Sequence, residues 1–237
     1  MRVLCNTWLL IVLTFNRFYI TLCDDHKNLG FIIDHQLNMD EQIKVVSQIC
    51  YLNLRSLRRI ASHLTFELKV QLVHSNILSF IDYCNSVYSG ISEKNLLKLQ
   101  KIQNNSVRFI YKLIGKSKYQ HIKPYLKKLH FLPVKFRIDF KIALLVFKCL
   151  NNMAPIYLKE LITLREVNKY SVRLDEDYYI LKVPKVPKLK PTNFAFSHIG
   201  PSVWNQLPYQ VRCLSDIVVF KKMLKKYYFD LAFIDID

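Results

Sequence analysis

The sequence is short of glycine and of paired cysteines, and each shortage excludes a class of protein. Only 4 of its 237 residues are glycine, and none belongs to a phosphate-binding loop or a G-x-S-x-G nucleophile motif. The 6 cysteines are widely spaced without a C-x-x-C pair. This predicts reduced thiols in an intracellular protein, nuclear or cytoplasmic, rather than a disulfide-stapled secreted domain. The 7 histidines form no H-x-x-x-H pair and no metal-spaced Cys/His cluster, so we expect no metal and no cofactor.

Acidic residues are also scarce, and the formal net charge is +17. The imbalance is greatest from Lys98 to Lys148, where 13 Lys or Arg accompany a single acid, Asp139. A stable helix surface usually mixes the two signs, so folding does not require this excess. The excess indicates a polyanionic partner, with nucleic acid first and a membrane surface second. Binding of this kind depends strongly on salt.

No apolar run reaches the length of about 20 residues that a helix needs to cross a bilayer. Residues 8–15 come closest, and they resemble the core of a signal peptide because they follow Arg2. Asn16 and Arg17 interrupt the run, and no small-x-small cleavage site follows. We expect a buried strand or helix here, with a signal or membrane anchor as the alternative. Residues 1–28 as a whole match no recognisable pattern and are left unassigned.

Apolar residues recur at helical spacing along most of the chain, which predicts a mainly α fold with one or two short β-strands. A short buried strand is expected at 29–34, and another at 178–181. Helices are expected from Asp40 to about 61, from near Thr65 to 80, from Ser92 to about 114, at 134–150, after Pro155 to about 164, and at 216–229. Residues 134–142 alternate strictly and could form a strand, but the apolar residues that follow favour a helix.

The helix expected from Ser92 to Ile114 has one basic edge, opposite its apolar face. Its polar residues repeat at intervals of four and three, and no acid follows Glu93. Most charged faces are simply solvated, but a face of one sign over this length favours contact with nucleic acid. The candidate nucleic-acid-binding residues are Lys94, Lys98, Lys101, Arg108, Lys112 and Lys116.

Three other features have both a structural and a functional interpretation. Residues 182–190 carry lysines between prolines, and because prolines remove amide donors the segment should be extended. It is either an arm that grips a nucleic-acid backbone or a soluble linker. Trp204 is expected to fill a core pocket, with base stacking as the alternative. Cys84 is expected to be a core residue, since no histidine base is evident beside it.

Six sequence blocks occur in an order and at spacings that resemble one family. They are residues 29–34, 80–88, 99–108, 121–126, 129–137 and 200–208. Together they resemble the C-terminal part of reverse transcriptases, the RNA-directed DNA polymerases of non-LTR (LINE) transposable elements of the jockey kind. Each block is weak by itself, but six in order are specific. The resemblance covers roughly residues 27 to 229.

The resemblance implies a division of the chain. Residues 29–115 would contain the last strand of the polymerase palm and a helical bundle-like thumb, which grips the template–primer duplex. Residues 116–237 would be the C-terminal helical region of the family. The basic edge from Lys94 to Lys112 then corresponds to the surface of the thumb that faces the duplex.

The catalytic carboxylates of the family have no convincing counterpart. A polymerase needs two or three carboxylates to hold two metal ions about 4 Å apart. The sequence Cys23-Asp24-Asp25 looks similar to the aspartate turn of the palm, but only three residues separate it from the block at 29–34. The family needs a helix and a strand there, so we expect Asp24 and Asp25 to be solvated turn residues.

The sequence therefore predicts that the chain is not an enzyme. It would be a non-catalytic remnant of a retrotransposon reverse transcriptase that binds RNA, DNA or their hybrid through basic helices. One alternative is a decayed open reading frame with no selected function. Another is a basic protein anchored to a membrane through residues 8–15. The oligomeric state is not predicted.

Overall fold

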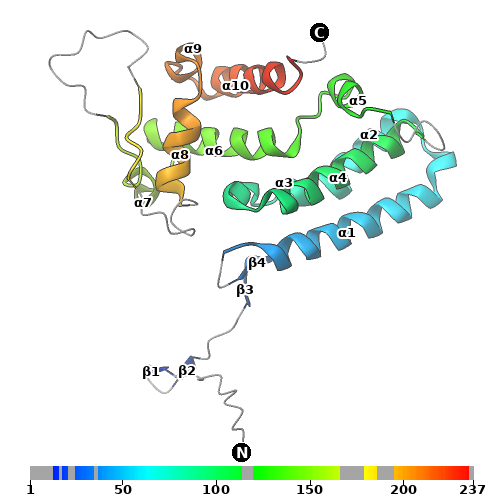
Figure 1. Ribbon diagram of the computed structural model, residues 1–237, viewed down its shortest axis with the longest axis horizontal. Coiled ribbons are helices and arrows are strands. Elements are labelled where there is room, and N and C mark those ends of the chain that lie inside the picture. Colours follow the sequence, from blue (N-terminus) through cyan, green and yellow to red (C-terminus); the bar gives the residue numbers. More distant parts are fainter. Residues whose placement is uncertain are drawn as a thin grey trace, which may run out of the picture.

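The computed structural model describes residues 13–15, 18–20, 25–34, 37–113, 120–165, 179–185 and 195–234. Within these residues the protein is mainly α-helical, as the sequence predicts. Figure 1 shows the helices gathered into one body, with two short β-hairpins on its N-terminal side.

The two hairpins precede the first helix. They pair β1 (Leu13–Phe15) with β2 (Phe18–Ile20), and β3 (Asp25–Asn28) with β4 (Phe31–Asp34). Leu29 and Gly30 both have positive φ, 49° and 86°, as a two-residue type I′ turn requires. β4 is the strand expected at 29–34, but Asp25 begins its partner strand, so the prediction that Asp25 lies in a turn is wrong. Cys23 and Asp24 lie outside the described residues.

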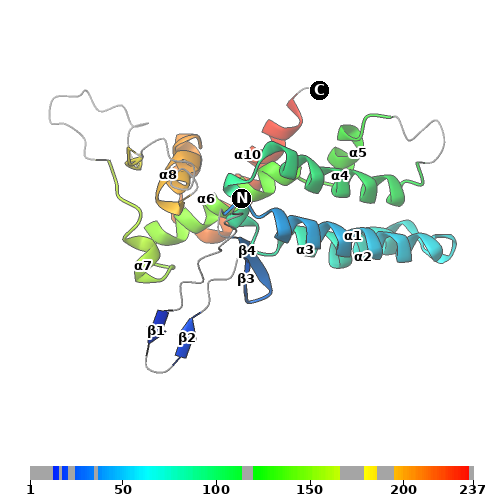
Figure 2. The same ribbon diagram turned by 60° about the horizontal axis from the view of Figure 1, so that its bottom comes forward.

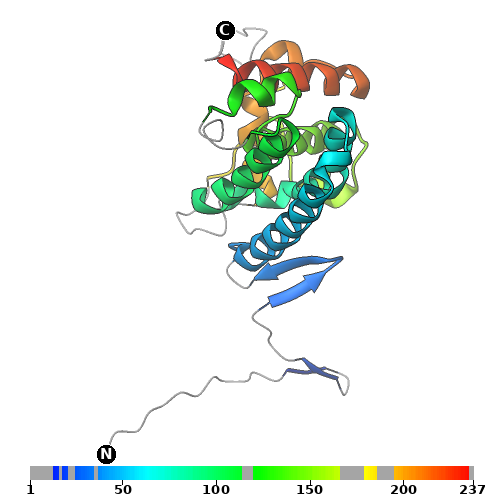
Figure 3. The same ribbon diagram turned by 90° about the vertical axis from the view of Figure 1, so that its right-hand side faces the viewer.

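The first group of helices packs beside the β3–β4 hairpin, which lies at the start of α1 (Figure 3). It comprises α1 (Asp40–Arg59), the 3-10 helices η1 (Ala61–His63) and η3 (Asn85–Gly90), α2 (Phe66–Val73), the π-helical turn η2 (His74–Leu78), α3 (Ser79–Asp82) and α4 (Glu93–Ile110). The expected starts at Thr65 and Ser92 are confirmed, because the hydroxyls of these residues accept hydrogen bonds from the first turns of α2 and α4. α1 begins at Asp40 as expected, but the N-cap is Met39, so the prediction that Asp40 caps this helix is wrong.

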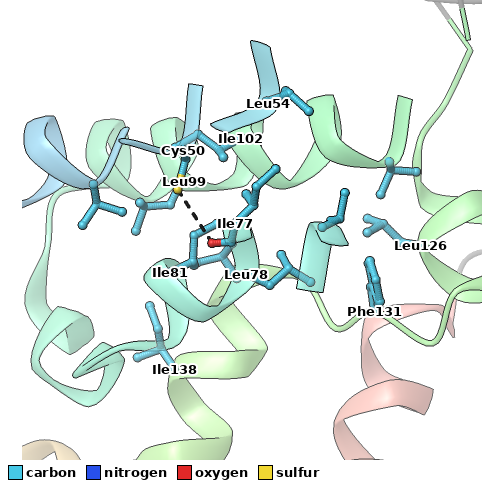
Figure 4. Close-up of a cluster of buried hydrophobic side chains, with 14 of the residues drawn as sticks. Cys50, Leu54, Ile77, Leu78, Ile81, Leu99, Ile102, Leu126, Phe131 and Ile138 are labelled. Atoms are coloured by element: carbon cyan, nitrogen blue, oxygen red, sulfur yellow. Dashed lines mark hydrogen bonds between the residues drawn. The ribbon is translucent and has the colours of Figure 1, made fainter. Parts of the chain in front are cut away.

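The π-helical turn η2 connects α2 to α3 and turns two carbonyl groups towards α1. The Asn53 side chain donates a hydrogen bond to the carbonyl of Asn76 at 2.8 Å. The Cys50 thiol donates to the carbonyl of Ile77 at 3.7 Å, inside the apolar cluster drawn in Figure 4. Burial raises the pKa of the Cys50 thiol to about 12, so this cysteine is an inert core donor.

The second group of helices continues the chain from residue 123. It comprises α5 (Lys123–Lys128), α6 (Val134–Leu150), α7 (Ile156–Lys159), α8 (Phe196–Asn205), α9 (Tyr209–Arg212) and α10 (Ile217–Ala232). α6 is a helix, as its length predicted, and packs against α4, α8 and α10. The Arg137 guanidinium on α6 pairs with Asp82 of α3 at 2.6 Å, which ties the two groups together.

Two single-residue predictions have opposite outcomes. Trp204 is 1 % exposed, and its indole N–H donates to the carbonyl of Tyr179 at 2.8 Å, so its core position is confirmed. Cys84 is exposed and has a φ of 50°, so its prediction as a core residue is wrong. It links α3 to η3 in a left-handed conformation, which turns its side chain away from the core. The sequence predicts a strand at 178–181. Among the described residues this stretch forms a single β-bridge, between Leu181 and Leu164.

Candidate nucleic-acid interface

The predicted basic edge lies on α4 and beyond its end. Lys94, Lys98 and Lys101 are exposed along the helix, and Arg108 is half-buried. Lys112 is exposed but lies past the helix, where it takes a φ of 53°. There the amide of Leu113 donates to the carbonyl of Arg108 at 2.9 Å, the hydrogen bond of a Schellman C-cap. The prediction that the helix continues to Ile114 is therefore wrong, because this cap ends it at Ile110. Lys116 lies outside the described residues.

α1 and α4 lie side by side and run in the same direction, as Figures 1 and 2 show. The Asn95 side chain donates to the Asp40 carboxylate near the start of both helices. About three helical turns further on, the Asn105 side chain donates to the hydroxyl of Tyr51 at 3.5 Å. These two contacts fix a parallel register, so α1 supplies a second wall beside the basic edge of α4.

A groove of about 870 Å³ lies between the two helices and is called the α1–α4 groove below. Lys94 and Lys98 line it from α4, and Lys44 and Arg55 line it from α1. Its two acids, Asp40 and Glu41, lie at the N-terminal end of α1, where acids suit the helix dipole. Glu41 is paired with Lys44 at 3.0 Å on the surface. Arg55 and Lys98 therefore lie where no acid lines the groove, and that part is positive.

Asn95 lies in the wall of the groove and is 1 % exposed. Because Asp40 accepts a hydrogen bond from the amide nitrogen of Asn95, the amide oxygen points elsewhere. Among the described residues this oxygen is the one buried side-chain polar atom without a hydrogen-bond partner. Tyr51 and Leu52, 44 % and 62 % exposed, add an aromatic and an aliphatic surface to the same groove.

The sequence reasoning missed the residues that α1 contributes. None of the candidate residues predicted from the sequence lies on this helix. A usable signal was present, since Lys44, Gln48, Tyr51 and Arg55 repeat at four, three and four, as the basic edge of α4 does. Two polar edges of the same period can flank one groove when their helices are parallel. That orientation is a tertiary property.

The lysine-rich segment at 182–190 is not brought to this groove. Its described part, up to residue 185, is exposed and has no helix. Asn205 of α8 holds Leu181, just before it, through two hydrogen bonds of 2.9 Å. Figures 1 and 2 show α8, to which Leu181 is bonded, away from the α1–α4 groove. Residues 186–190 lie outside the described part of the chain.

Two further findings concern the described residues alone. They contain no group of three or more His, Cys, Asp or Glu side chains that could hold a metal ion. Their helices are each too short or too polar to cross a membrane. Comparison of the chain with protein-family models, with curated proteins and with solved structures found no match.

Proposed function

We propose that this protein binds the backbone of nucleic acid through the α1–α4 groove and the basic edge of α4, without catalysing a reaction. The observation that carries the proposal is the groove itself, where Lys44, Arg55, Lys94 and Lys98 come together from two parallel helices. Convergent cations recognise phosphates irrespective of base sequence. The resemblance of six sequence blocks to the thumb and C-terminal region of non-LTR reverse transcriptases supports a template–primer duplex as the ligand.

The salt dependence of binding tests the proposal. Fluorescence anisotropy with a labelled RNA–DNA hybrid and a DNA duplex should show affinity falling steeply between about 50 mM and about 200 mM salt. For four phosphate contacts the slope of log K against log salt should be about −3.6. A flat salt response, or no binding at the lowest salt, contradicts the proposal.

A charge-reversal pair, one residue in the groove and one on the basic edge of α4, separates binding at this surface from an effect of net charge. The double variant Lys98→Glu, Lys101→Glu should weaken binding strongly, while circular dichroism shows the helices intact. The matched control is Lys221→Glu, Lys222→Glu, which changes the net charge equally on exposed positions of α10. Equal loss of affinity in both variants would mean that net charge, and not the groove, determines binding.

Primer extension tests the absence of catalysis. The purified protein, given a primed RNA template, deoxynucleotides and Mg²⁺ or Mn²⁺, should yield no extended product. Metal-dependent extension would contradict the assignment as a non-catalytic protein.

A further inference from the structure

A cavity of about 420 Å³ lies where three parts of the chain meet, and it is called the α6–α10 cavity below. One wall comes from η2 and α3, the second from the connection between α5 and α6 and the first half of α6, and the third from α10. The α6–α10 cavity and the α1–α4 groove share no lining residue among those described. The ionisable side chains that line the cavity are His74, Asp82, His130, Arg137, Lys141 and Lys225.

Arg137 is fixed in the wall of this cavity by bonds on two sides. Its Nε donates to the carbonyl of Leu132 at 3.2 Å, and its Nη1 donates to the Asp82 carboxylate at 2.6 Å. The Arg137 side chain is only 13 % exposed. A guanidinium has five N–H donors, so three remain beyond these two bonds, and no described residue accepts from them. Arg137 is therefore an immobilised cation with donors left for a ligand.

The charge of the α6–α10 cavity is positive even after its acid is counted. Asp82 is the one acid in its lining, and both carboxylate oxygens have partners, Arg137 and the amide of Asn85 at 3.3 Å. Lys141 of α6 and Lys225 of α10 are exposed, and no described residue forms an ion pair with either. Two positive charges are thus left unmatched. They complement a phosphate monoester, which carries about −1.5 to −2 at neutral pH.

The remaining wall of the cavity is apolar and partly aromatic. Phe131, drawn in Figure 4, is buried, and Phe140 of α6 is half-buried. Leu129 and Leu132 complete this wall. A volume of about 420 Å³ lies within the range of sites for whole small molecules, roughly 300–1,000 Å³, and exceeds the need of a single phosphate group. The ligand should therefore carry an organic group, and a flat aromatic ring suits walls that contain phenylalanine.

We propose that the α6–α10 cavity binds a mononucleotide. Its phosphate lies among Arg137, Lys141 and Lys225, and its base lies against Phe131 and Phe140. Because the three cations come from two helices, separate phosphate oxygens accept charge-assisted hydrogen bonds from both α6 and α10. The site is a cavity apart from the α1–α4 groove, so it does not rest on the proposed function.

Calorimetric titration of the full chain tests the ligand class. Adenosine or uridine 5′-monophosphate should bind saturably at one site, at constant ionic strength. Adenosine, which lacks the phosphate, should not bind, and ribose 5-phosphate, which lacks the base, should bind more weakly. Absence of saturable binding by both nucleotides overturns the proposal. Ribose 5-phosphate that binds as tightly as the nucleotides also overturns it, because the aromatic wall would then take no part.

Two matched double variants locate the site. Lys141→Gln with Lys225→Gln removes the two unpaired cations, and affinity for the nucleotide should fall about tenfold for each lysine, since hydrogen bonds to charged groups are among the stronger ones. The control is Lys135→Gln with Lys221→Gln, which changes the same net charge at exposed positions of the same two helices outside the cavity lining. It should keep the wild-type affinity. Equal loss in both variants overturns the proposal.

The outcome for the cavity is distinguishable from the outcome for the groove. Lys98→Glu with Lys101→Glu should leave nucleotide affinity unchanged, although it weakens binding of the RNA–DNA hybrid. A loss of nucleotide affinity as large as that in Lys141→Gln with Lys225→Gln would place the nucleotide in the α1–α4 groove and overturn the proposal. If the wild type binds the nucleotide but no hybrid, the proposed function is rejected and the cavity site stands.

Discussion

The two hydrophobic clusters of the protein are built from different side chains. The cluster under α1 and α4 is mainly aliphatic, with Ile77, Leu99 and Ile102 fully buried at its centre (Figure 4). The cluster around α6, α8 and α10 contains a stack of aromatic rings, with Phe147 on Phe220 at 4.1 Å and Trp204 at 5.9 Å from Phe220. Aromatic rings bury a large area per residue, so a few side chains in this stack account for much of the area that the second cluster buries.

Buried polar groups differ between the clusters in a corresponding way. In the first cluster the buried polar groups that bridge its elements are neutral side-chain amides. Gln42 accepts from the amide of Ile32 at 2.9 Å, and Gln103 donates to the carbonyl of Leu132 at 2.8 Å. Because each needs its own partner, these bonds specify one register for β4, α1, α4 and α6. The α1–α4 groove depends on that register. The second cluster is stabilised mainly by the apolar area that it buries, and it acts as a scaffold.

The largest expected effect is therefore in the aromatic cluster. Trp204→Ala removes the indole between α6 and α10 and leaves the carbonyl of Tyr179 without its donor. The expected loss in the free energy of unfolding is about 3–5 kcal/mol. Urea denaturation followed by circular dichroism measures it. Tyr157→Ala, at a residue 67 % exposed on α7, is the control and should change little. A loss below about 1 kcal/mol for Trp204→Ala would show that the cluster is not a scaffold.

The next effect is a pH dependence specific to α6. Burial raises the pKa of Asp139 from 3.8 to about 6, although Lys135 opposes the shift. Between these values the folded protein keeps a proton that the unfolded chain has released. Stability therefore falls as the pH rises through this window and stays lower above it. Asp139→Asn should be more stable than the wild type by about 3 kcal/mol at pH 7, and the difference should be much smaller at pH 4.

Unfolding in urea at several pH values measures this difference. Comparing variant with wild type at each pH cancels the titration of the histidines. Asp230→Asn on α10 is the matched control, because Asp230 is exposed and the same difference should not appear. If the gain of Asp139→Asn were the same at all pH values, the carboxylate would not be perturbed by burial. The buried amides of the first cluster do not titrate and should contribute no such dependence.

The helices and the aromatic core could be predicted from sequence because both follow local patterns. The caps at Thr65 and Ser92, the stripe of α1 and the burial of Trp204 each depend on residue type and spacing. Cys84 could not be placed, because a left-handed residue between two helices leaves no periodic signal. The contribution of Arg55 to the groove depends on parallel packing of α1 and α4.

The smallest expected effect on stability is the difference between two helix caps, one from each region. The Asp216 carboxylate accepts from the amides of Val218 and Val219, both at 2.8 Å, at the start of α10. The Ser92 hydroxyl accepts from the amide of Asn95 at a longer 3.3 Å, and that amide also bonds to the carbonyl of Ser92 at 2.9 Å. Removing the Ser92 hydroxyl thus leaves its donor satisfied. Removing the Asp216 carboxylate leaves two amides to solvent and one favourable charge missing from the helix N-terminus.

Asp216→Ala should therefore cost about 1–2 kcal/mol and Ser92→Ala about 0.5 kcal/mol. Chemical denaturation of both variants beside Ser215→Ala, an exposed neighbour outside the cap, measures the difference. The reverse order would mean that Ser92 does more than cap α4. Ser92 lines the α1–α4 groove next to Asn95, so its loss would then act through the contact between Asn95 and Asp40 that sets the parallel register of the two helices. The variant Ser92→Thr keeps the hydroxyl. If its unfolding free energy returned to that of the wild type, the loss in Ser92→Ala would be due to the hydroxyl and not to a change in packing.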